Sequence, residues 1–132
     1  MIRRLAYVSR PRPNLSLVEI PRIVATCRAH NAVDGITGVL LFTGLDFAQL
    51  IEGEPNVVAA LWARIQADDR HRDIVTFLDE RAPHRWFADW RVGFPSDSVV
   101  VAQIAAWREG TRLWTETERA DVHQVLAAAY AL

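Results

Sequence analysis

The 132-residue sequence contains no lysine, a single cysteine and no apolar run approaching the ~20 residues of a membrane helix. The lone Cys27 excludes an internal disulfide framework and a cysteine zinc site, and it is compatible with a reducing cytoplasm, where we place the protein. The N-terminal MIRRLAYVSR is too short in its apolar part for a signal peptide. With a net charge of -1, no general attraction to nucleic acid or to an anionic membrane is expected.

Hydrophobic residues make up 51% of the chain, which fits an ordinary soluble globular protein with one core. All 15 basic residues are arginine, and we interpret this as genomic composition bias, although arginine also suits phosphate binding. The sequence has no internal repeat, no low-complexity segment and no metal-ligand cluster. These features indicate one folded unit without a resident metal.

Apolar periodicity predicts five strands and four helices. Strands are expected over 2–9, 36–42, 47–51, 74–78 and 90–94, and helices over about 16–31, 53–71, 99–107 and 115–129. The order β-α-β-β-α-β-β predicts a ferredoxin-like α+β sandwich, followed by two C-terminal helices. We expect residues 1–95 to form the main domain and 96–132 a helical cap. The near-continuous apolar run 74–78 is expected to be a central strand, buried on both faces.

The first helix is expected to end near His30 and Asn31, with residues 32–35 forming a turn into the next strand. Pro21 strains the start of this helix, which either kinks there or begins later. Asn31 has two interpretations. It is either a helix C-terminal residue in a left-handed conformation, or a hydrogen-bonding amide at the mouth of a cleft.

Gln49 lies inside an apolar strand pattern. The period of two places Phe47, Gln49 and Ile51 on one face and Ala48, Leu50 and Glu52 on the other. A buried carboxamide needs partners for its NH2 and its C=O, because leaving them unpaired costs roughly 1–3 kcal/mol. Either another side chain or a bound ligand is therefore expected to meet Gln49.

Two further features of the sequence each have two interpretations. Tyr7 shares a strand face with Leu5 and Ser9, and it is either a core tyrosine bonded to a backbone carbonyl or part of a site. The ionisable residues at the end of the second helix are either a solvated helix end or a binding site. There, Arg64 and Asp68 are four residues apart and are expected to pair.

Five segments together resemble the BLUF family of flavin-binding blue-light sensors, in matching order and at matching separations. They are Tyr7 in LAYVSR, His30 and Asn31 in AHNAVDGITG, Gln49 in FAQLIEG, the run RIQADDRHRDI, and Trp90 in FADWRV. The resemblance covers the first three quarters of the chain. The closing helices match the family's short, single-domain members.

The resemblance implies a noncovalently held flavin, FAD or FMN, between the first two helices. Tyr7, Gln49 and Trp90 would be the photoactive residues, with Asn31 bonding the carbonyl edge of the ring. The implied flavin-binding residues are Tyr7, Ile23, His30, Asn31, Gln49, Arg64, Ile65, Asp68, Arg70 and His71. No enzymatic reaction is implied. We expect a homo-oligomer that signals to a downstream protein partner through the last strand and the terminal helices.

Val92 departs from the family pattern, because many members have methionine there, two residues after the tryptophan. Valine is shorter and stiffer, which puts signal transmission and dark recovery in doubt. Whether Trp90 faces inward or outward is left open by the alternation. The main alternative function is a light-silent or flavin-free relative serving as an interaction module. An acylphosphatase-like hydrolase lacks its expected phosphate loop, and a flavin redox enzyme lacks an evident general acid.

Overall fold

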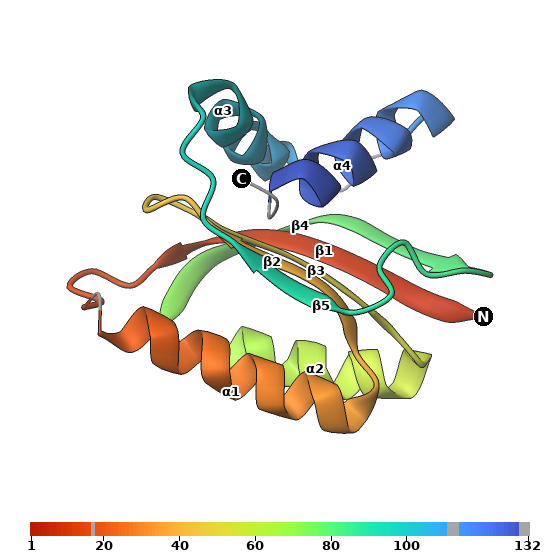
Figure 1. Ribbon diagram of the computed structural model, residues 1–132, viewed down its shortest axis with the longest axis horizontal. Helices are drawn as coiled ribbons and strands as arrows, with labels where there is room; N and C mark the ends of the chain where they lie inside the picture. Colours follow the sequence, from red (N-terminus) through yellow and green to blue (C-terminus); the bar gives the residue numbers. More distant parts are fainter. Residues whose placement is uncertain (17, 111–113, 130–132) are drawn as a thin grey trace.

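A five-stranded sheet with helices on both faces forms the protein (Figure 1), in a computed structural model that describes residues 1–16, 18–110 and 114–129. The strands are β1 (Ile2–Pro11), β2 (Thr37–Phe42), β3 (Phe47–Gly53), β4 (His71–Ala82) and β5 (Trp90–Gly93). The helices are α1 (Glu19–Asp34), α2 (Pro55–Ala67), α3 (Ser98–Ala106), the short 3-10 helix η1 (Trp107–Glu109) and α4 (Glu116–Ala129). No described helix is both long enough and apolar enough to span a membrane.

The strand order is β4-β1-β3-β2-β5, in which β1 is antiparallel to β3 and β4, and β2 is antiparallel to β3. β5 runs parallel to β2 at one edge. This is the ferredoxin-like α+β arrangement that the sequence predicts, and the prediction is confirmed. The central position predicted for residues 74–78 is wrong, because β4 lies at the other edge. Cores on both faces of the sheet still cover it, so its sequence has the pattern of a doubly buried strand.

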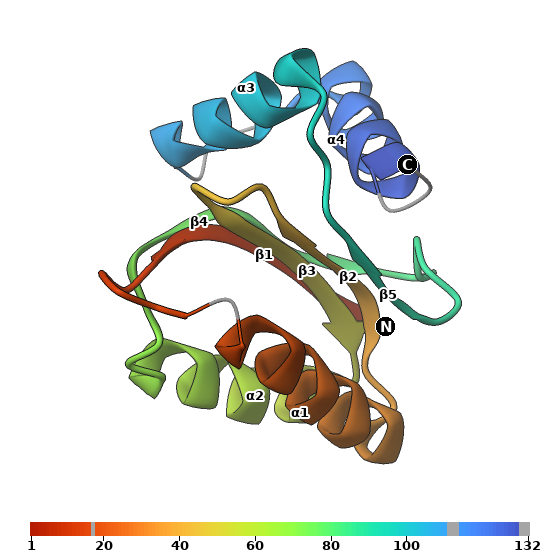
Figure 2. The same cartoon turned by 60° about the vertical axis from the view of Figure 1, so that its left-hand side comes forward.

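Two helical layers enclose the sheet. α1 and α2 lie against one face, and α3 and α4 against the other (Figure 2). Leu5, Tyr7 and Ile51 belong to the core under α2, whereas Ala48 and Leu50 belong to the core under the C-terminal helices. The predicted alternation along β3 is therefore present. Gln49 faces α1 and α2, and the cap covers the opposite face.

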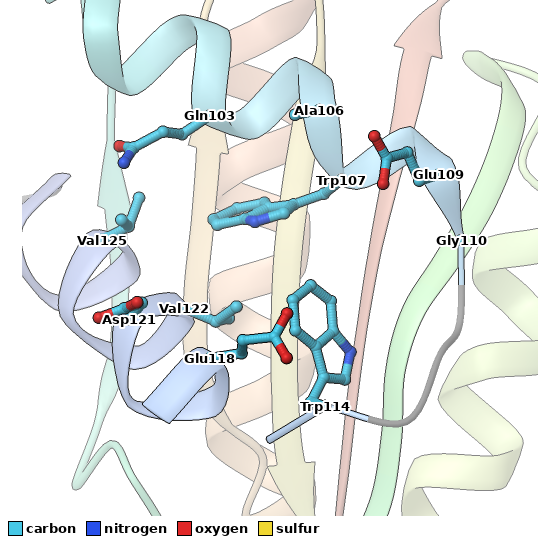
Figure 3. Close-up of a pocket in the computed structure, with 10 residues that line it drawn as sticks. All are labelled: Gln103, Ala106, Trp107, Glu109, Gly110, Trp114, Glu118, Asp121, Val122 and Val125. Atoms are coloured by element: carbon cyan, nitrogen blue, oxygen red, sulfur yellow. The ribbon is translucent and has the colours of Figure 1, made fainter. Parts of the chain in front are cut away.

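The cap packs through aromatic side chains. Trp107 stacks on Phe77 of β4 with 4.7 Å between ring centroids, and Trp114 donates from Nε1 to the Phe77 carbonyl over 2.7 Å. Arg108 donates from Nη2 to Asp46 in the β2–β3 turn over 2.7 Å. A hollow of about 450 Å³ lies between α3, η1 and α4, with Trp107 and Trp114 projecting into it (Figure 3). These contacts join the cap to the sheet.

The predicted end of the first helix is wrong, because α1 continues to Asp34. Gly35 is the left-handed residue, with φ 67°, and its N–H donates to the Asn31 carbonyl. Residues 32–34 contain no helix breaker, whereas glycine adopts this conformation without strain. Asn31 therefore lies inside the last turn. At the other end, Pro21 sits in the first turn of α1, where a missing N–H leaves no intrahelical bond unmade.

The predicted pair between Arg64 and Asp68 is also wrong. α2 ends at Ala67, and the backbone of Asp68 is extended, with ψ 116°. The side chains therefore lose the helical i, i+4 geometry. Arg64 instead approaches Asp34 of α1 at 3.5 Å, and Asp68 pairs with Arg70 at 2.6 Å.

The last strand is shorter than predicted, because β5 ends at Gly93. Phe94 lies beyond it and is 58% exposed. Pro95 follows directly and has no backbone N–H to continue the ladder, which explains why pairing stops. Phe94 therefore lies outside the strand that carries Trp90 and Val92.

Candidate functional site

A cleft lies between α1, α2 and the sheet. It consists of an inner cavity of about 60 Å³ and an outer cavity of about 380 Å³, which share Cys27, Gln49, Ile65 and Asp68. The inner cavity is also lined by Tyr7, Ile23, Leu40, Phe47 and His71, and the outer one by Thr26, His30, Asn31, Leu61, Arg64, Ala67 and Arg70. Cofactor sites are typically concave and mostly apolar, with a few placed polar groups. This cleft has that character.

Tyr7 and Gln49 form the polar centre of the inner cavity. They are directly opposite each other in the β1–β3 register, and Gln49 Nε2 donates to the Tyr7 hydroxyl over 2.7 Å. Both residues are 3% exposed. A side chain thus meets the buried amide, which is one of the two options that the sequence left open. The hydroxyl of Tyr7 likewise has a side-chain partner among the described residues.

The surroundings of Tyr7 keep its phenol protonated. The rings of Trp62 and His71 lie 5.3 Å and 6.0 Å from it, centroid to centroid. Burial raises the pKa of Tyr7 well above its ordinary value, and the hydrogen bond from Gln49 opposes this only partly. Tyr7 is therefore a neutral phenol at any physiological pH.

Asn31 is the second amide at the cleft. It is 2% exposed, and its Nδ2 has no hydrogen-bond partner among the described residues. Ile23, Cys27 and Asn31 follow one another at four-residue spacing, so they occupy one face of α1. An unpaired buried amide costs roughly 1–3 kcal/mol, and a ligand in the adjoining outer cavity that offered a hydrogen-bond acceptor would remove that penalty.

The outer cavity has a charged rim. His30 is exposed, and the side chain of Arg64 is 53% exposed. Asp68 accepts hydrogen bonds from Arg70 at Nε and Nη2, and Arg70 thereby holds the pKa of Asp68 below its usual range. The rim therefore presents cationic side chains and one ionised carboxylate beside an apolar interior.

His71 connects three elements at the base of the inner cavity. Its Nε2 lies 2.7 Å from the Ile65 carbonyl, and its Nδ1 lies 2.7 Å from Ser9 Oγ. Because a carbonyl only accepts, Nε2 must donate, and the Nδ1 of a neutral ring then accepts from the Ser9 hydroxyl. His71 thereby fixes the end of α2 against β1.

Trp90 faces inward, which answers the question that the sequence left open. It packs with Ile23, Leu40 and Phe47 on the α1 side of the sheet, and its buried Nε1 has no partner among the described residues. Leu40 is the register partner of both Gln49 and Val92. Val92 is therefore on the same sheet face as Gln49, separated from it by one strand.

Cys27, Leu40 and Phe47 line the inner cavity, and none of the three was predicted as a site residue. Local signals could have found two of them. Cys27 is midway between Ile23 and Asn31 on one helical face, and Phe47 alternates with Gln49. Leu40 required the strand register, which no local pattern supplies. Burial raises the pKa of the Cys27 thiol, so it behaves as a small apolar group.

Comparisons with known proteins agree with this geometry. The family model described as BLUF, sensors of blue light using FAD, matches residues 2–93. The blue light- and temperature-regulated antirepressor BluF of Escherichia coli (strain K12) is 36% identical over 87 residues, which are 66% of this chain and 22% of that protein. The photoactivated adenylate cyclase subunit beta of Euglena gracilis is 36% identical over 111 residues, 76% of this chain and 13% of that protein.

The solved structures show the same fold. The dark-state structure of BlrB, a BLUF protein, has a TM-score of 0.74 and 32% sequence identity, covering 96% of this chain and 96% of that one. By contrast, the chain spans less than a quarter of the length of the two curated relatives. The similarity to those relatives thus covers only part of their length.

BLUF domains bind FAD or FMN, and the residues present here fit a flavin. The cleft offers aliphatic walls at Ile23 and Ile65, an amide at Asn31 whose Nδ2 has no partner in the described part of the chain, and a polar centre at Tyr7 and Gln49. A ring system that is flat, largely apolar and edged with carbonyl acceptors suits that set of groups. By its matched residues and its fold, the chain belongs to the BLUF family of blue-light sensors that use FAD.

Proposed function

We propose that this chain is a blue-light receptor in which Tyr7 and Gln49 are the switch. The 2.7 Å hydrogen bond between these two buried side chains, inside the flavin cleft, is the observation that carries the proposal. Each group depends on the other for a partner, because both lie away from water. A change at one side chain therefore requires a change at the other.

When bound, flavin would supply the blue-light absorption and an electron acceptor. Tyr7 would give up an electron and its phenolic proton and later recover both, so no net reaction would take place. Burial keeps the pKa of Tyr7 high, which ensures that the phenol holds its proton in the dark. The phenol would therefore release its proton only after it has given up an electron.

Gln49 supplies two states. Its Nε2 now donates to Tyr7, and a half-turn of the amide would bring the carbonyl oxygen there instead, to accept from the Tyr7 hydroxyl. The two orientations would present different hydrogen-bonding atoms to the edge of a bound flavin, and this difference would account for a red shift of its absorption. Both keep the buried amide paired with Tyr7, so they differ little in energy, as a two-state element requires.

The remaining cleft residues hold the flavin. Asn31, whose Nδ2 has no partner among the described residues, would donate to the ring edge, and Ile23 and Ile65 would pack against the ring faces. His30, Arg64, Asp68 and Arg70, which line the outer cavity, would hold the polar chain of the cofactor. His71 acts through Ser9 and Ile65 to position β1 and α2.

The signal leaves through β5. This strand carries Trp90 and Val92 on the site face, pairs with β2, and leads into the C-terminal helices. We expect a protein partner, or a second copy of the chain, to contact that cap. Val92 is stiff at the position where methionine is frequent, so signal transmission and the rate of dark recovery are the properties that we expect this residue to alter.

Absorption spectra in darkness and after blue illumination test the proposal. Purified protein with flavin bands and a reversible red shift supports the receptor. Flavin bands without a shift would support a light-silent relative, and colourless protein that takes up no added flavin would support a flavin-free interaction module. The last two outcomes each contradict the proposed switch.

A further inference from the structure

A buried carboxylate lies on the sheet face opposite the flavin cleft. Glu52 of β3 is 0% exposed and accepts hydrogen bonds from Arg4 Nε at 2.8 Å and from the backbone N–H groups of Trp86 and Phe87, each at 2.8 Å. Three donors thus make four hydrogen bonds to this carboxylate, counting the second Trp86 contact at 2.9 Å. Glu52 therefore fixes the segment before β5 to the strand that carries Gln49.

Arg4 completes this polar cluster. It is 3% exposed, bonds Glu80 of β4, and donates to the His84 carbonyl over 2.8 Å. Its guanidinium carbon lies 3.9 Å from the ring centroid of Trp86. Two contacts thus hold Trp86 in place: its backbone N–H bonds to Glu52, and its ring contacts the guanidinium of Arg4.

Helix α4 meets the cluster through one imidazole. The ring of His123 is parallel to that of Trp86, with an interplanar angle of 1° and 4.6 Å between centroids, and it meets Phe87 edge-on at 5.7 Å. Val122 and Leu126 of α4 pack into the core on this face, and Arg119 of α4 approaches Glu80 at 3.9 Å. His123 is the residue of α4 whose ring stacks on the polar cluster.

We propose that His123 is a proton-sensitive latch, which holds α4 on Trp86 as a neutral imidazole and loosens the helix when it is protonated. The latch belongs to the cap and its connection to the sheet, and it works with or without light. In acid, the cap surface that α4 covers becomes accessible. The proton thereby acts on the same helices that we expect to carry the light signal.

The charges around His123 support the proposal that protonation loosens α4. Burial and then the positive charge of Arg4 lower the pKa of His123, while Glu52 opposes them. Glu52 is already paired with Arg4, and Glu80 with Arg4 and Arg119. A second hollow, separate from the one between α3, η1 and α4, lies beside His123. Other ionisable residues that line it are Arg81, His84, Arg85 and Glu116.

The direction of the pH dependence follows from the linkage between the protonation of His123 and the docking of α4. A histidine whose pKa is lower when α4 is docked binds protons more tightly when the helix is undocked. Docking is then strongest above the ordinary histidine pKa of about 6.5, and it weakens as the pH falls below that value. Each pKa unit between the two states corresponds to a tenfold change in the docking equilibrium.

Amide hydrogen exchange of the whole chain, corrected for intrinsic exchange at each pH, measures the docking directly. We expect the protection of α4 amides to fall several-fold between about pH 7.5 and about pH 5.5, while the amides of β1 and β3 keep theirs. His123→Phe keeps a ring to stack on Trp86 but has no proton to gain. In this variant the protection of α4 should be independent of pH.

His84→Gln is the matched control, because it removes an exposed histidine lining the same hollow while the backbone carbonyl that Arg4 uses remains. It should keep the pH dependence of the wild type. Equal α4 protection at both pH values in the wild type would overturn the proposal, as would the same loss of protection in His123→Phe. If His123→Phe fails to fold, an NMR titration of the wild-type His123 ring decides, and a pKa at or above 6.5 would overturn the latch.

Discussion

Tyr7 and Gln49 occupy directly opposed positions on two neighbouring antiparallel strands, and the amide of Gln49 donates to the phenol over 2.7 Å. The pairing follows from the β1–β3 register, because side chains opposite each other share a face of the sheet. Among the described residues that line the inner cavity, Tyr7 is the only phenol and Gln49 the only side-chain amide, and the register places them side by side. The geometry therefore supplies a hydrogen-bonded pair that is ready to change partners.

Replacing Tyr7 with phenylalanine should leave flavin bound and abolish the light-induced red shift. Phenylalanine fills the same space but removes the hydroxyl that accepts from Gln49. Absorption spectra before and after blue illumination measure both results. Trp62→Phe, which changes a neighbouring ring without touching this hydrogen bond, is the control and should keep the shift. A full red shift in Tyr7→Phe would remove Tyr7 from the mechanism.

Gln49→Leu should also keep flavin and lose the red shift, because leucine has no hydrogen-bonding group to reorient. Gln66→Leu is matched in chemistry, lies exposed on α2 and should behave as the wild type. The same light-minus-dark spectra compare the two variants. If both variants lost the shift equally, the effect could not be assigned to the amide beside Tyr7.

Asn31→Ala should weaken flavin binding about tenfold, equivalent to about 1.4 kcal/mol, because it removes the amide that has no partner within the described chain. For the same reason the Tm of the flavin-free protein should stay constant or rise. Flavin titration and thermal unfolding measure the two effects. Asn56→Ala, at an exposed position of α2, should change neither. Unchanged affinity in Asn31→Ala would contradict the role given to this amide.

Glu52→Leu should lower the free energy of unfolding by about 3–5 kcal/mol, because the buried Arg4 loses its fully buried carboxylate partner and keeps only Glu80. Adding Arg4→Met should restore part of that loss by removing the incompletely paired buried charge. The recovery stays incomplete, since the N–H groups of Trp86 and Phe87 also lose their acceptor. Urea denaturation of the two single variants and the double variant measures the coupling. Simple additivity of the two substitutions would contradict the pairing.

Removing residues 96–132 should make the remaining chain aggregate or lose cooperative folding. Ile104, Trp107 and Leu126 of the cap are buried in the core on that face of the sheet, which includes Leu41 and Leu50. An exposed apolar face of this kind favours association. Size-exclusion chromatography and urea denaturation of residues 1–95 test the prediction. A monomeric fragment as stable as the whole chain would show that the cap is dispensable.

Local patterns predicted most of the fold. Periods of two and of about 3.6 gave the strands and helices in the right order, and the alternation of Phe47, Gln49 and Ile51 placed the amide on the correct face. They also predicted that a partner would meet this amide, but not which kind. The partner became definite only through the β1–β3 register, which joins residues 42 positions apart.

The errors have physical causes. The end of α1 was placed too early because Asn31 resembles a helix terminus, whereas Gly35 tolerates the left-handed conformation more easily. The predicted Arg64–Asp68 pair assumed that the second helix includes Asp68. In the structure, α2 ends one residue earlier, at Ala67. Glu52 was placed on the correct face, but its buried contacts with Arg4 and residues 86–87 depend on long-range packing that no local pattern reveals.

The light-minus-dark absorption spectrum of the flavin-loaded wild type, measured beside that of Gln49→Leu, tests the central claim most directly. The account predicts a red shift of the flavin band in the wild type that reverses in darkness, and none in the variant with flavin still bound. A wild-type spectrum unchanged by blue light, or an equal shift in the variant, would contradict it.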